Sequence, residues 1–396
     1  MTDTTCTPAH LDSPGKSSPW RYFDAMLDHC YDYAEAAHAR GQPIVGIMCE
    51  FTPREIIMAA GGVPVCLCGG SAETVAVAEQ YLPANLCPLI KSTYGYLVKA
   101  SNPFLNWASL VVAETTCDGK KKMFELMAAT KPMYVLELPQ KSEDAGALEH
   151  WTEELRKFMR FLEAQFQVQV TDDRLRDAIR VMNRERALRR QLAELMALDI
   201  PPFSGRQLLD LKSLISGISA DLEQYEAILR HVHEGLHEPA APPRKAPVRV
   251  LLTGVPMAHG AERVLELIEA CGAIVVCQEN CTGLKPILED VAEDDPDPIR
   301  SLARKYYHLP CSVMTPNTGR FDTLRALAAQ FRPHCVIELI WQACLTYDVE
   351  SYRVRTFTED TLHHPYLKIT TDYSPADSAR LTARLEALME TVRARL

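Results

Sequence analysis

The sequence lacks the long apolar run that a membrane-spanning helix requires, because no stretch of its 396 residues approaches roughly 18 apolar residues without a charge. Residues 1–20 are polar and lack the apolar centre of a signal peptide. The sequence also lacks a G-x-x-x-x-G-K-[ST] motif, in which backbone amides and a lysine hold nucleotide phosphates. We therefore expect a cytoplasmic protein, and any use of ATP would have to take place on a partner.

Basic charge is scarce as well. The chain carries 42 Lys and Arg residues against 52 Asp and Glu residues, which gives a net charge of −10. Proteins that bind nucleic acid present a basic face to the phosphates, so this balance argues against a nucleic-acid partner. A hydrophobic content of 47% is ordinary for a globular protein, and the length allows two domains with separate cores.

Cysteine, by contrast, is abundant, with 13 residues. An odd number cannot pair completely into disulfides, and nothing in residues 1–20 indicates export. In a reducing cytoplasm, thiols serve either as buried core residues or as metal ligands. The positions of the cysteines decide between these two uses.

Two parts of the chain alternate between strand and helix patterns, which predicts an α/β fold with parallel sheets covered on both faces. In the first domain, residues 41–146, the expected strands are 43–48, 63–68, 109–114 and 132–138. In the second domain, residues 248–396, they are 248–253, 273–277, 335–340 and 366–370. The shared order predicts two similar flavodoxin-like or Rossmann-like domains.

Three further segments complete the expected organisation. Residues 1–40 predict a disordered lead-in followed by a helix. Residues 147–237 are rich in Leu, Ala, Glu and Arg, with apolar residues at helical spacing, and predict a helical segment. Residues 238–247 contain four prolines and predict a stiff linker between the helical segment and the second domain.

Six cysteines fall where open parallel sheets bind ligands, beyond the carboxyl ends of the strands. Four lie at or just past such ends, and two lie in the loops between the second and third strands of each domain. The six rim thiols are Cys49, Cys87, Cys117, Cys281, Cys311 and Cys344. We expect them to share one site in the crevice between the domains.

Soft thiolates from several converging loops suit zinc or an iron–sulfur cluster. A structural zinc site usually takes a close pair of cysteines from one knuckle. The only close pairs are Cys66 with Cys68 and Cys277 with Cys281. Cys66 and Cys68 would point to the same side of a strand, so both can face a core. Single thiols on separate loops therefore favour an iron–sulfur cluster.

The surroundings of two rim thiols are expected to lower their pKa. Cys49 precedes a T-x-x-E capping box formed by Thr52 and Glu55, so a helix N-terminus would lie beside it. Cys117 precedes the lysines 120–122, which either hold a phosphate or a partner or form a solvated helix face.

The alternative for every cysteine is burial in a core, because cysteine is among the most buried residue types. This interpretation is applied to the four cysteines that lie away from the rim or inside expected elements: Cys6, Cys30, Cys271 and Cys335. For the six rim thiols, their positions in loops favour function, since binding residues concentrate there.

Carboxylates and one histidine near the rim are candidate proton donors. Glu50, Glu114, Glu279 and Glu338 lie at strand ends, where a buried carboxyl group either carries protons or accepts backbone hydrogen bonds. His259 lies in the loop after the first strand of the second domain, and its ordinary pKa suits proton transfer. Glu50, Glu279 and His259 are the catalytic candidates.

Four stretches carry a family likeness: GIMCEFTPRE at 46–55, LPANLCPLIKS at 82–92, ETTCDGKKK at 114–122 and WQACLTY at 341–347. Together they resemble the superfamily of 2-hydroxyacyl-CoA dehydratases and benzoyl-CoA reductases, over roughly residues 40–380. In the dehydratase subunits three cysteines hold one 4Fe–4S cluster, and the resemblance places them at Cys87, Cys117 and Cys344.

The other three rim thiols, Cys49, Cys281 and Cys311, resemble the additional ligands of the double-cubane cluster proteins, one branch of that superfamily. In that branch two cubes are joined by a bridging sulfide. Cys66 or Cys68 is an alternative to Cys49, although Cys49 lies nearer a strand end.

The resemblance implies a low-potential reductase that receives electrons from a separate ATP-hydrolysing iron–sulfur activator and acts on a small molecule or an acyl-CoA. It also implies a homodimer for the double-cubane branch. Two alternatives stay open: a dehydratase subunit with a single 4Fe–4S cluster and a different partner subunit, or a non-catalytic electron-transfer protein.

Overall fold

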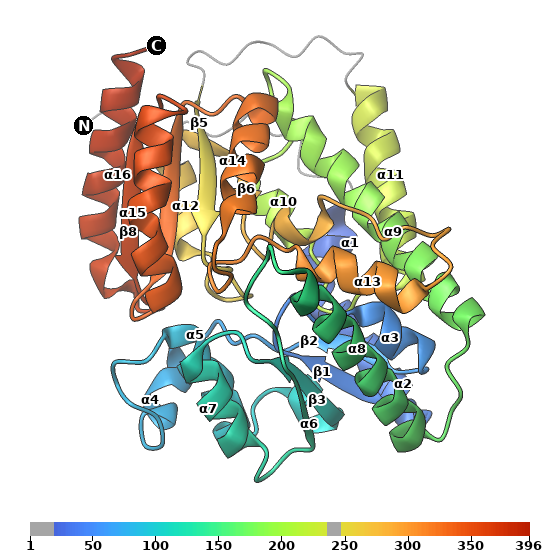
Figure 1. Ribbon diagram of the computed structural model, residues 1–396. Helices are drawn as coiled ribbons and strands as arrows, with labels where there is room; N and C mark the ends of the chain where they lie inside the picture. Colours follow the sequence, from blue (N-terminus) through green and yellow to red (C-terminus); the bar gives the residue numbers. More distant parts are fainter. Residues whose placement is uncertain (1–19, 236–246) are drawn as a thin grey trace.

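Two four-stranded parallel sheets form the framework of the protein, whose computed structural model describes residues 20–235 and 247–396 (Figure 1). The first sheet has the order β2-β1-β3-β4, and the second has the order β6-β5-β7-β8. The strands are β1 (Ile44–Ile47), β2 (Val63–Cys66), β3 (Ala108–Glu114), β4 (Met133–Leu136), β5 (Val248–Gly254), β6 (Ala273–Glu279), β7 (Cys335–Trp341) and β8 (Tyr366–Thr371). The two orders are identical, which confirms the predicted α/β fold with two similar parallel-sheet halves.

Apolar strand residues explain why both faces of the first sheet are covered. On one face, Val45 and Val112 are fully buried against α3, α8 and α9; on the other, Val111 and Ala113 pack against the remaining helices of this half. The helices of this half are α1 (Trp20–Asp24), α2 (Met26–Ala39), α3 (Arg54–Ala59), α4 (Val75–Ala78), α5 (Pro88–Lys99), α6 (Pro103–Trp107) and α7 (Asp118–Met127).

The predicted helical segment is present and contacts both sheets. Its helices are α8 (Ala145–Phe166), α9 (Asp172–Glu194), α10 (Gly205–Asp210) and α11 (Ser219–Gly235). On α8, the buried residues Trp151, Leu155, Phe158 and Leu162 recur every three or four positions and form one apolar face. Helix α8 packs against β4, whereas α10 packs against β6 of the second sheet.

The second half carries α12 (Arg263–Ala270), α13 (Pro298–Tyr307), α14 (Thr318–Phe331), α15 (Leu345–Asp360) and α16 (Ser378–Arg393). Helix α13 leaves this half and packs against α8, so that Ile299 and Leu302 lie in the core under the first sheet. Short 3₁₀ turns lie at Ala72–Thr74, Leu195–Ala197, Lys285–Ile287 and Pro375–Asp377. Within the described residues, no helix has the length and apolar character needed to cross a membrane.

Two sequence expectations fall largely on residues outside the described part. The predicted lead-in, with Cys6, lies there, and so does the predicted linker 238–247 except for its last residue. The described cysteines assigned to cores are confirmed as such: Cys30 and Cys335 are buried, and Cys271 packs against the same core with partial exposure.

The predicted capping box is wrong. Pro53, not Thr52, is the N-cap of α3, and no side chain caps this helix. The Thr52 hydroxyl instead donates a hydrogen bond to the carboxylate of Glu114 on β3. The Glu55 carboxylate accepts a hydrogen bond from Arg186 of α9. Both side chains of the pattern are therefore used for contacts between elements.

Candidate metal centre

The rim cysteines lie where the two sheets leave room for a ligand. In a parallel sheet of order β2-β1-β3-β4, the connections that follow β1 and β3 leave on opposite faces, which opens a crevice at their carboxyl ends. Cys49 follows β1 and Cys117 follows β3 within two or three residues. Cys281 and Cys344 follow β6 and β7 in the same way in the second half.

Three of the thiols stand at helix N-termini. Cys87 is the N-cap of α5, Cys117 that of α7, and Cys344 that of α15. These helices have 12, 10 and 16 residues. Each therefore directs the positive end of its dipole towards the thiol, and together they favour negative charge at this place.

These three thiols form one group. The thiol of Cys344 hydrogen-bonds to that of Cys87, which lowers the pKa of Cys87 and raises the pKa of Cys344 well above its usual range. Cys117 acts electrostatically on Cys87, and Cys344 acts on Cys117. The hydrogen bond favours Cys87 as the thiolate of the pair.

The other three rim thiols form a second group. Cys281 and Cys311 both act electrostatically on Cys49, and Cys311 acts on Cys281. The two groups meet because Cys311 also acts on Cys117. The structure thus brings all six rim thiols close enough to act on one another electrostatically between the two halves.

Burial makes most of these thiols difficult to ionise. It raises the pKa of Cys49 well above its usual range, raises that of Cys117, and raises that of Cys281 to about 12. Lys120 acts in the opposite direction on Cys49 and Cys117 but does not outweigh burial. The expectation that the pKa of Cys49 and Cys117 would be lowered is therefore wrong for the free thiols.

The three lysines after Cys117 do not act as one basic patch. Lys120 turns inward, and its ammonium group donates a hydrogen bond of 2.8 Å to the Met48 carbonyl between the thiols. Lys121 forms an ion pair of 2.8 Å with Asp118, and the exposed Lys122 pairs with Glu125. A single charge from this run reaches the site.

A second lysine approaches the thiols from the other half. Lys285 is 3% exposed and forms an ion pair of 3.0 Å with Glu279. Cys281 and Cys311 act on it electrostatically and, with Glu279, raise its pKa although burial opposes this. Two inward-facing ammonium groups therefore lie beside the thiols: Lys120 acts on Cys49 and Cys117, and Lys285 lies near Cys281 and Cys311.

The carboxylates at the strand ends have different surroundings. Glu50 forms ion pairs with Arg54 at 2.7 Å and Lys212 at 3.0 Å, and although burial opposes ionisation these cations lower its pKa to about 2. Burial raises the pKa of Glu114 to about 7, and its Oε2 atom has no hydrogen-bond partner among the described residues. Glu50 is thus held as a carboxylate, whereas Glu114 can carry a proton.

Glu279 and Glu338 are buried on either side of Arg320. The Arg320 guanidinium lies 3.5 Å from Glu279 and 3.1 Å from Glu338. Burial raises the pKa of Glu338, and Tyr366 donates a hydrogen bond of 2.6 Å to it. These two carboxylates therefore offset the positive charges of the buried cations Arg320 and Lys285.

His259 lies at the junction of the two halves. Its Nε2 atom is 3.3 Å from the Lys212 carbonyl, and its Nδ1 atom is 3.7 Å from Glu262. Burial lowers its pKa, so the ring is neutral at pH 7. The loop that carries it approaches Gly70 of the first half so closely that a Cβ atom there would lie 2.3 Å from the His259 carbonyl oxygen.

Cys66 and Cys68 do not share a core-facing side. Cys66 packs partly against the core and also lines a small cavity with Glu50 and Arg54. Cys68 donates a hydrogen bond of 3.4 Å to the Met48 carbonyl, the same carbonyl that Lys120 binds, and burial raises its pKa to about 11. Cys68 therefore faces the thiol site.

A family model for the 2-hydroxyglutaryl-CoA dehydratase D-component matches residues 49–392, which includes strands β2 to β8 and all six rim thiols. The chain belongs to this dehydratase family. Members of the family are iron–sulfur enzymes of the dehydratase type.

Individual members of the dehydratase family match over most of their length. The Escherichia coli K12 protein YjiM, named as a dehydratase subunit, is 39% identical over 89% of this chain and 92% of its own. Lactoyl-CoA dehydratase subunit beta of Anaerotignum propionicum is 23% identical over 88% and 92%. The beta subunit of (R)-2-hydroxyglutaryl-CoA dehydratase of Acidaminococcus fermentans is 22% identical over 89% and 93%.

The donor set fits the cofactor type of the dehydratase family. In the described part of the chain, no group of three or more His, Cys, Asp or Glu residues is arranged to hold a single metal ion. A cubane differs from an ion because each thiolate binds its own iron, so its ligands stand further apart. Six free thiols, three helix N-termini and two inward lysines supply the soft ligands and positive surroundings that an anionic cluster needs.

Sequence reasoning missed four residues of this dehydratase-family site. They are Lys212, Arg320, Tyr347 and Tyr373. Lys212 donates to the Cys281 carbonyl at 3.1 Å, and the Tyr373 hydroxyl donates to the Gly69 carbonyl at 3.0 Å. Lys212, Arg320 and Tyr373 stand outside the four stretches that carry the family likeness, and their contacts join segments far apart in sequence. Only Tyr347, three residues after Cys344, had a nearby signal.

Proposed function

We propose that the protein is a low-potential iron–sulfur reductase in which the six rim thiols hold a double-cubane cluster. The observation that carries this proposal is the convergence of six free thiols between the two halves. We assign Cys87, Cys117 and Cys344 to one cube and the other three thiols to the second. Three thiols suit one cube with an open position, and two adjacent sets suit two joined cubes.

The chain's own residues would bind and tune this cluster. When bound, it supplies single electrons at low potential to a substrate bond. Metal binding removes the protons from the thiols, four of which, Cys49, Cys117, Cys281 and Cys344, have a raised pKa in the free state. The helix N-termini at Cys87, Cys117 and Cys344, together with Lys120 and Lys285, then offset the negative charge of the cluster.

Proton supply is the second task of the site. Glu50, Glu279 and His259 are the candidates from the sequence, and Glu114 joins them because its carboxyl group has a free oxygen atom and a pKa of about 7. We assign Glu50 and Glu279 to charge balance beside the thiols, since both carboxylates are ion-paired. Glu114 and His259 are left as proton carriers for the substrate.

Electrons would come from an ATP-hydrolysing activator in the cytoplasm that docks on α15, and the reductase itself would be a homodimer acting on a small molecule or an acyl-CoA. Helix α15 begins immediately after Cys344 and exposes Leu345, Val349 and Tyr352, each more than 70%, on one face. A short path from this face to a proposed ligand favours electron delivery there.

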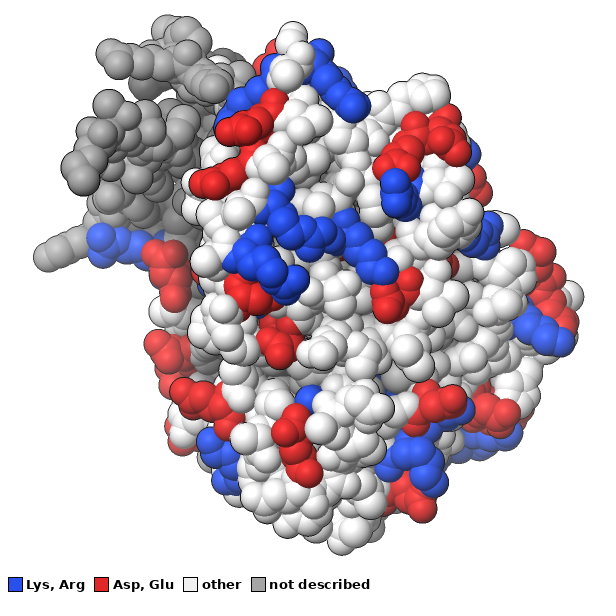
Figure 2. Space-filling view, turned by 90° about the vertical axis from the view of Figure 1, so that its left-hand side faces the viewer, with Lys and Arg blue, Asp and Glu red and all other residues white. Residues whose placement is uncertain are grey.

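Charged residues flank that face, as in many transient interfaces. A groove of about 500 Å³ between α15, β8 and α16 is lined by Arg355, Lys368 and Arg384, and also by Asp348 and Glu359. Arg355 pairs with Glu359, and Lys368 pairs with Asp348. Figure 2 views the side of the molecule at the left of Figure 1, where α15 and α16 lie, and shows Lys and Arg side chains gathered on it with Asp and Glu side chains beside them. Charges of both signs are therefore available to a docking partner.

A single-cluster dehydratase subunit is the second candidate. The observation that favours it is that only Cys87, Cys117 and Cys344 are helix N-caps, and the same three carry the family resemblance. In that case Cys49, Cys281 and Cys311 would be unligated thiols, and a different subunit would complete the enzyme.

Iron and acid-labile sulfide counting after anaerobic purification separates the two candidates. We expect about eight irons per chain for the double cube and about four for the single cube. Zinc as the only metal would overturn both. Replacing Cys311 by Ala should lower the iron content, whereas the control Cys271→Ala, at a thiol outside the site, should leave it unchanged. Equal iron in both variants would contradict the double cube.

A further inference from the structure

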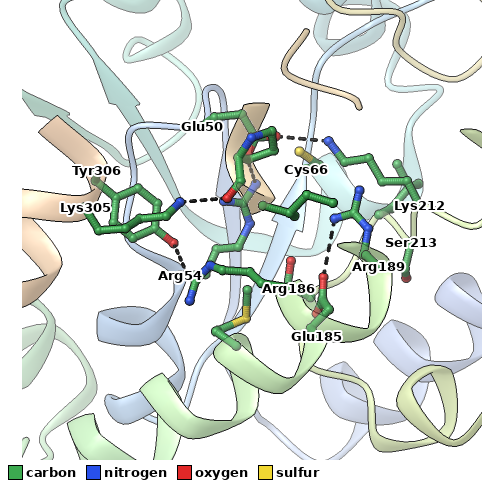
Figure 3. Close-up of a pocket in the computed structure, with 15 residues that line it drawn as sticks. Glu50, Arg54, Cys66, Glu185, Arg186, Arg189, Lys212, Ser213, Lys305 and Tyr306 are labelled. Carbon is green, nitrogen blue, oxygen red and sulfur yellow. Dashed lines mark hydrogen bonds and ion pairs between the residues drawn. The ribbon is translucent and has the colours of Figure 1, made fainter. Parts of the chain in front are cut away.

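A small cavity with strongly charged walls lies beside the thiol site (Figure 3). Its free space is about 20 Å³, enough for one water-sized occupant. Three parts of the chain form it: Glu50, Arg54 and Cys66 from the first half, α9 and the loop after α10 from the helical segment, and α13 with the 3₁₀ turn Lys285–Ile287 from the second half. An occupant would therefore touch all three parts.

Positive charge is in excess around this cavity. Five cations line it: Arg54, Arg186, Arg189, Lys212 and Lys305. Three carboxylates face them: Glu50 and Glu185 on the wall, and Glu55 behind it. Each carboxylate is already paired.

The pairs account for every cation except Lys305. Glu50 binds Arg54 and Lys212 at 2.7 and 3.0 Å. Arg186 binds Glu55, and Arg189 lies 3.8 Å from Glu185. Even if Lys305 gave up its proton, four cations would face three carboxylates, and arginine does not lose its proton in proteins.

Lys305 has no counter-ion of its own. It is 6% exposed, and its ammonium group donates a 2.8 Å hydrogen bond to the Pro286 carbonyl and lies 4.4 Å from the centre of the Tyr306 ring. No carboxylate of the described residues lies within ion-pair distance. Burial and the nearby Arg186 lower its pKa to about 7.

The thiol site does not supply the missing negative charge to Lys305. Thiols are among the strongest charges acting on Lys120 and Lys285. The strongest charges acting on Lys305 are those of arginines and glutamates, and none is a thiol. The thiols therefore act less strongly on Lys305 than on Lys120 and Lys285.

We propose that the cavity binds a small monovalent inorganic anion of halide size. Buried charges in proteins are paired or coordinated, because an isolated charge in a low-dielectric interior is costly. An anion between Lys305 and the arginines reduces the excess from two positive charges to one and links the first half, the helical segment and α13. The limited space excludes larger carboxylates and phosphates.

Bromide is the probe for this site, because its anomalous scattering identifies it in crystals. Crystals of the cluster-loaded protein soaked in sodium bromide should show an anomalous peak beside the Lys305 ammonium group. The peak should disappear in Lys305→Met and remain in Lys157→Met, a control at a lysine whose side chain is 51% exposed. A cavity without a peak in the unaltered protein would overturn the proposal.

Thermal unfolding provides the solution test. At equal ionic strength, sodium bromide should raise the unfolding temperature by several degrees relative to sodium gluconate, whose anion is too large for the cavity. This difference should be absent from Lys305→Met and reduced in Arg189→Gln, a milder change at the cavity wall. An undiminished difference in both variants would assign the effect to the general surface and overturn the proposal.

Discussion

At the scale of single residues, the inward charge of Lys120 has a measurable consequence. Adding an electron to an already anionic cluster is easier when a positive charge lies nearby. Replacing Lys120 by Met should therefore lower the midpoint potential of the cluster, by an amount on the order of tens of millivolts. Redox titration followed by electron paramagnetic resonance measures it.

The control for this change lies two residues away. Lys122 is in the same run, but its side chain is 77% exposed and pairs with Glu125. Lys122→Met should leave the potential unchanged, with iron content equal in the two variants. Equal shifts in both would mean that the charge of the run, rather than the buried ammonium group, affects the cluster.

Lys305 should make stability depend on pH when no small anion is present. With a folded pKa of about 7 and an ordinary value near 10.4 in the unfolded chain, the unfolded state binds one more proton between these values. Stability therefore rises with pH across that window, by at most about 1.4 kcal/mol per pH unit. Burial, Arg186 and Arg54 cause the depression, against Glu55 and Glu50.

Urea unfolding in gluconate at pH 6.5, 8 and 9.5 measures this contribution as the difference between the unaltered protein and Lys305→Met. Compared with the unaltered protein, the variant should be most stable at pH 6.5, because there the unaltered protein carries a buried charge on Lys305. A difference that stays constant over the three pH values would show that Lys305 keeps its proton throughout.

Several residue-level predictions from the sequence failed because the deciding partner is distant along the chain. The T-x-x-E pattern at Thr52 and Glu55 fits a capping box locally, yet Glu55 pairs with Arg186, 131 positions away. The inward turn of Lys120 did have a local signal. Lys120 shares a helical face with the buried Met123 and Met127, at intervals of three and four residues.

At the scale of elements, substitutions on α15 can test whether electrons are delivered through this helix. Its exposed face begins next to Cys344, and Val349 lies at the middle of that face. Val349→Asp should slow ATP-dependent reduction by the activator about tenfold, because it places a charge in a desolvated contact. Reduction by a small chemical reductant should be unaffected, since it needs no docking.

An exposed apolar residue elsewhere is the matched control. Ile200 is 42% exposed in the loop after α9, away from α15. Ile200→Asp should leave both reduction rates unchanged. If Val349→Asp also slowed the chemical reduction, the change would have disturbed the cluster itself, and α15 would not be the docking surface.

The order of elements was predictable because each strand has a recognisable sequence pattern within a few residues. Apolar runs such as 248–253 end at glycine or cysteine and alternate with helical spacing, which is sufficient for two parallel sheets. The position of α13 was not predictable. It lies in the second half of the sequence but buries Ile299 and Leu302 under the first sheet, and burial between distant segments leaves no local pattern.

At the scale of the whole molecule, the site exists only where the two halves meet. The rim thiols come from both halves: Cys49, Cys87 and Cys117 from the first, and Cys281, Cys311 and Cys344 from the second. In the proposed double cube, each set of three ligands draws on both halves. The sequence alone predicted that four of these thiols follow strand ends, and the structure has them there. The approach of thiols from one half to those of the other could not be predicted from the sequence, because it depends on loops of the two halves that pack closely against each other.

A substitution at Gly70 tests the packing between the two halves directly. It is a position where a methyl group would meet backbone, the His259 carbonyl at 2.3 Å and the Ala258 carbonyl at 2.9 Å, so the halves would have to move apart. Gly70→Ala should cost about 1–3 kcal/mol of stability in urea unfolding. It should also lower the iron content, because both sets of thiols span the junction. Gly235→Ala, where no atom lies within 4 Å, should change neither. Full iron loading in Gly70→Ala would mean that each half can hold its cube without the other.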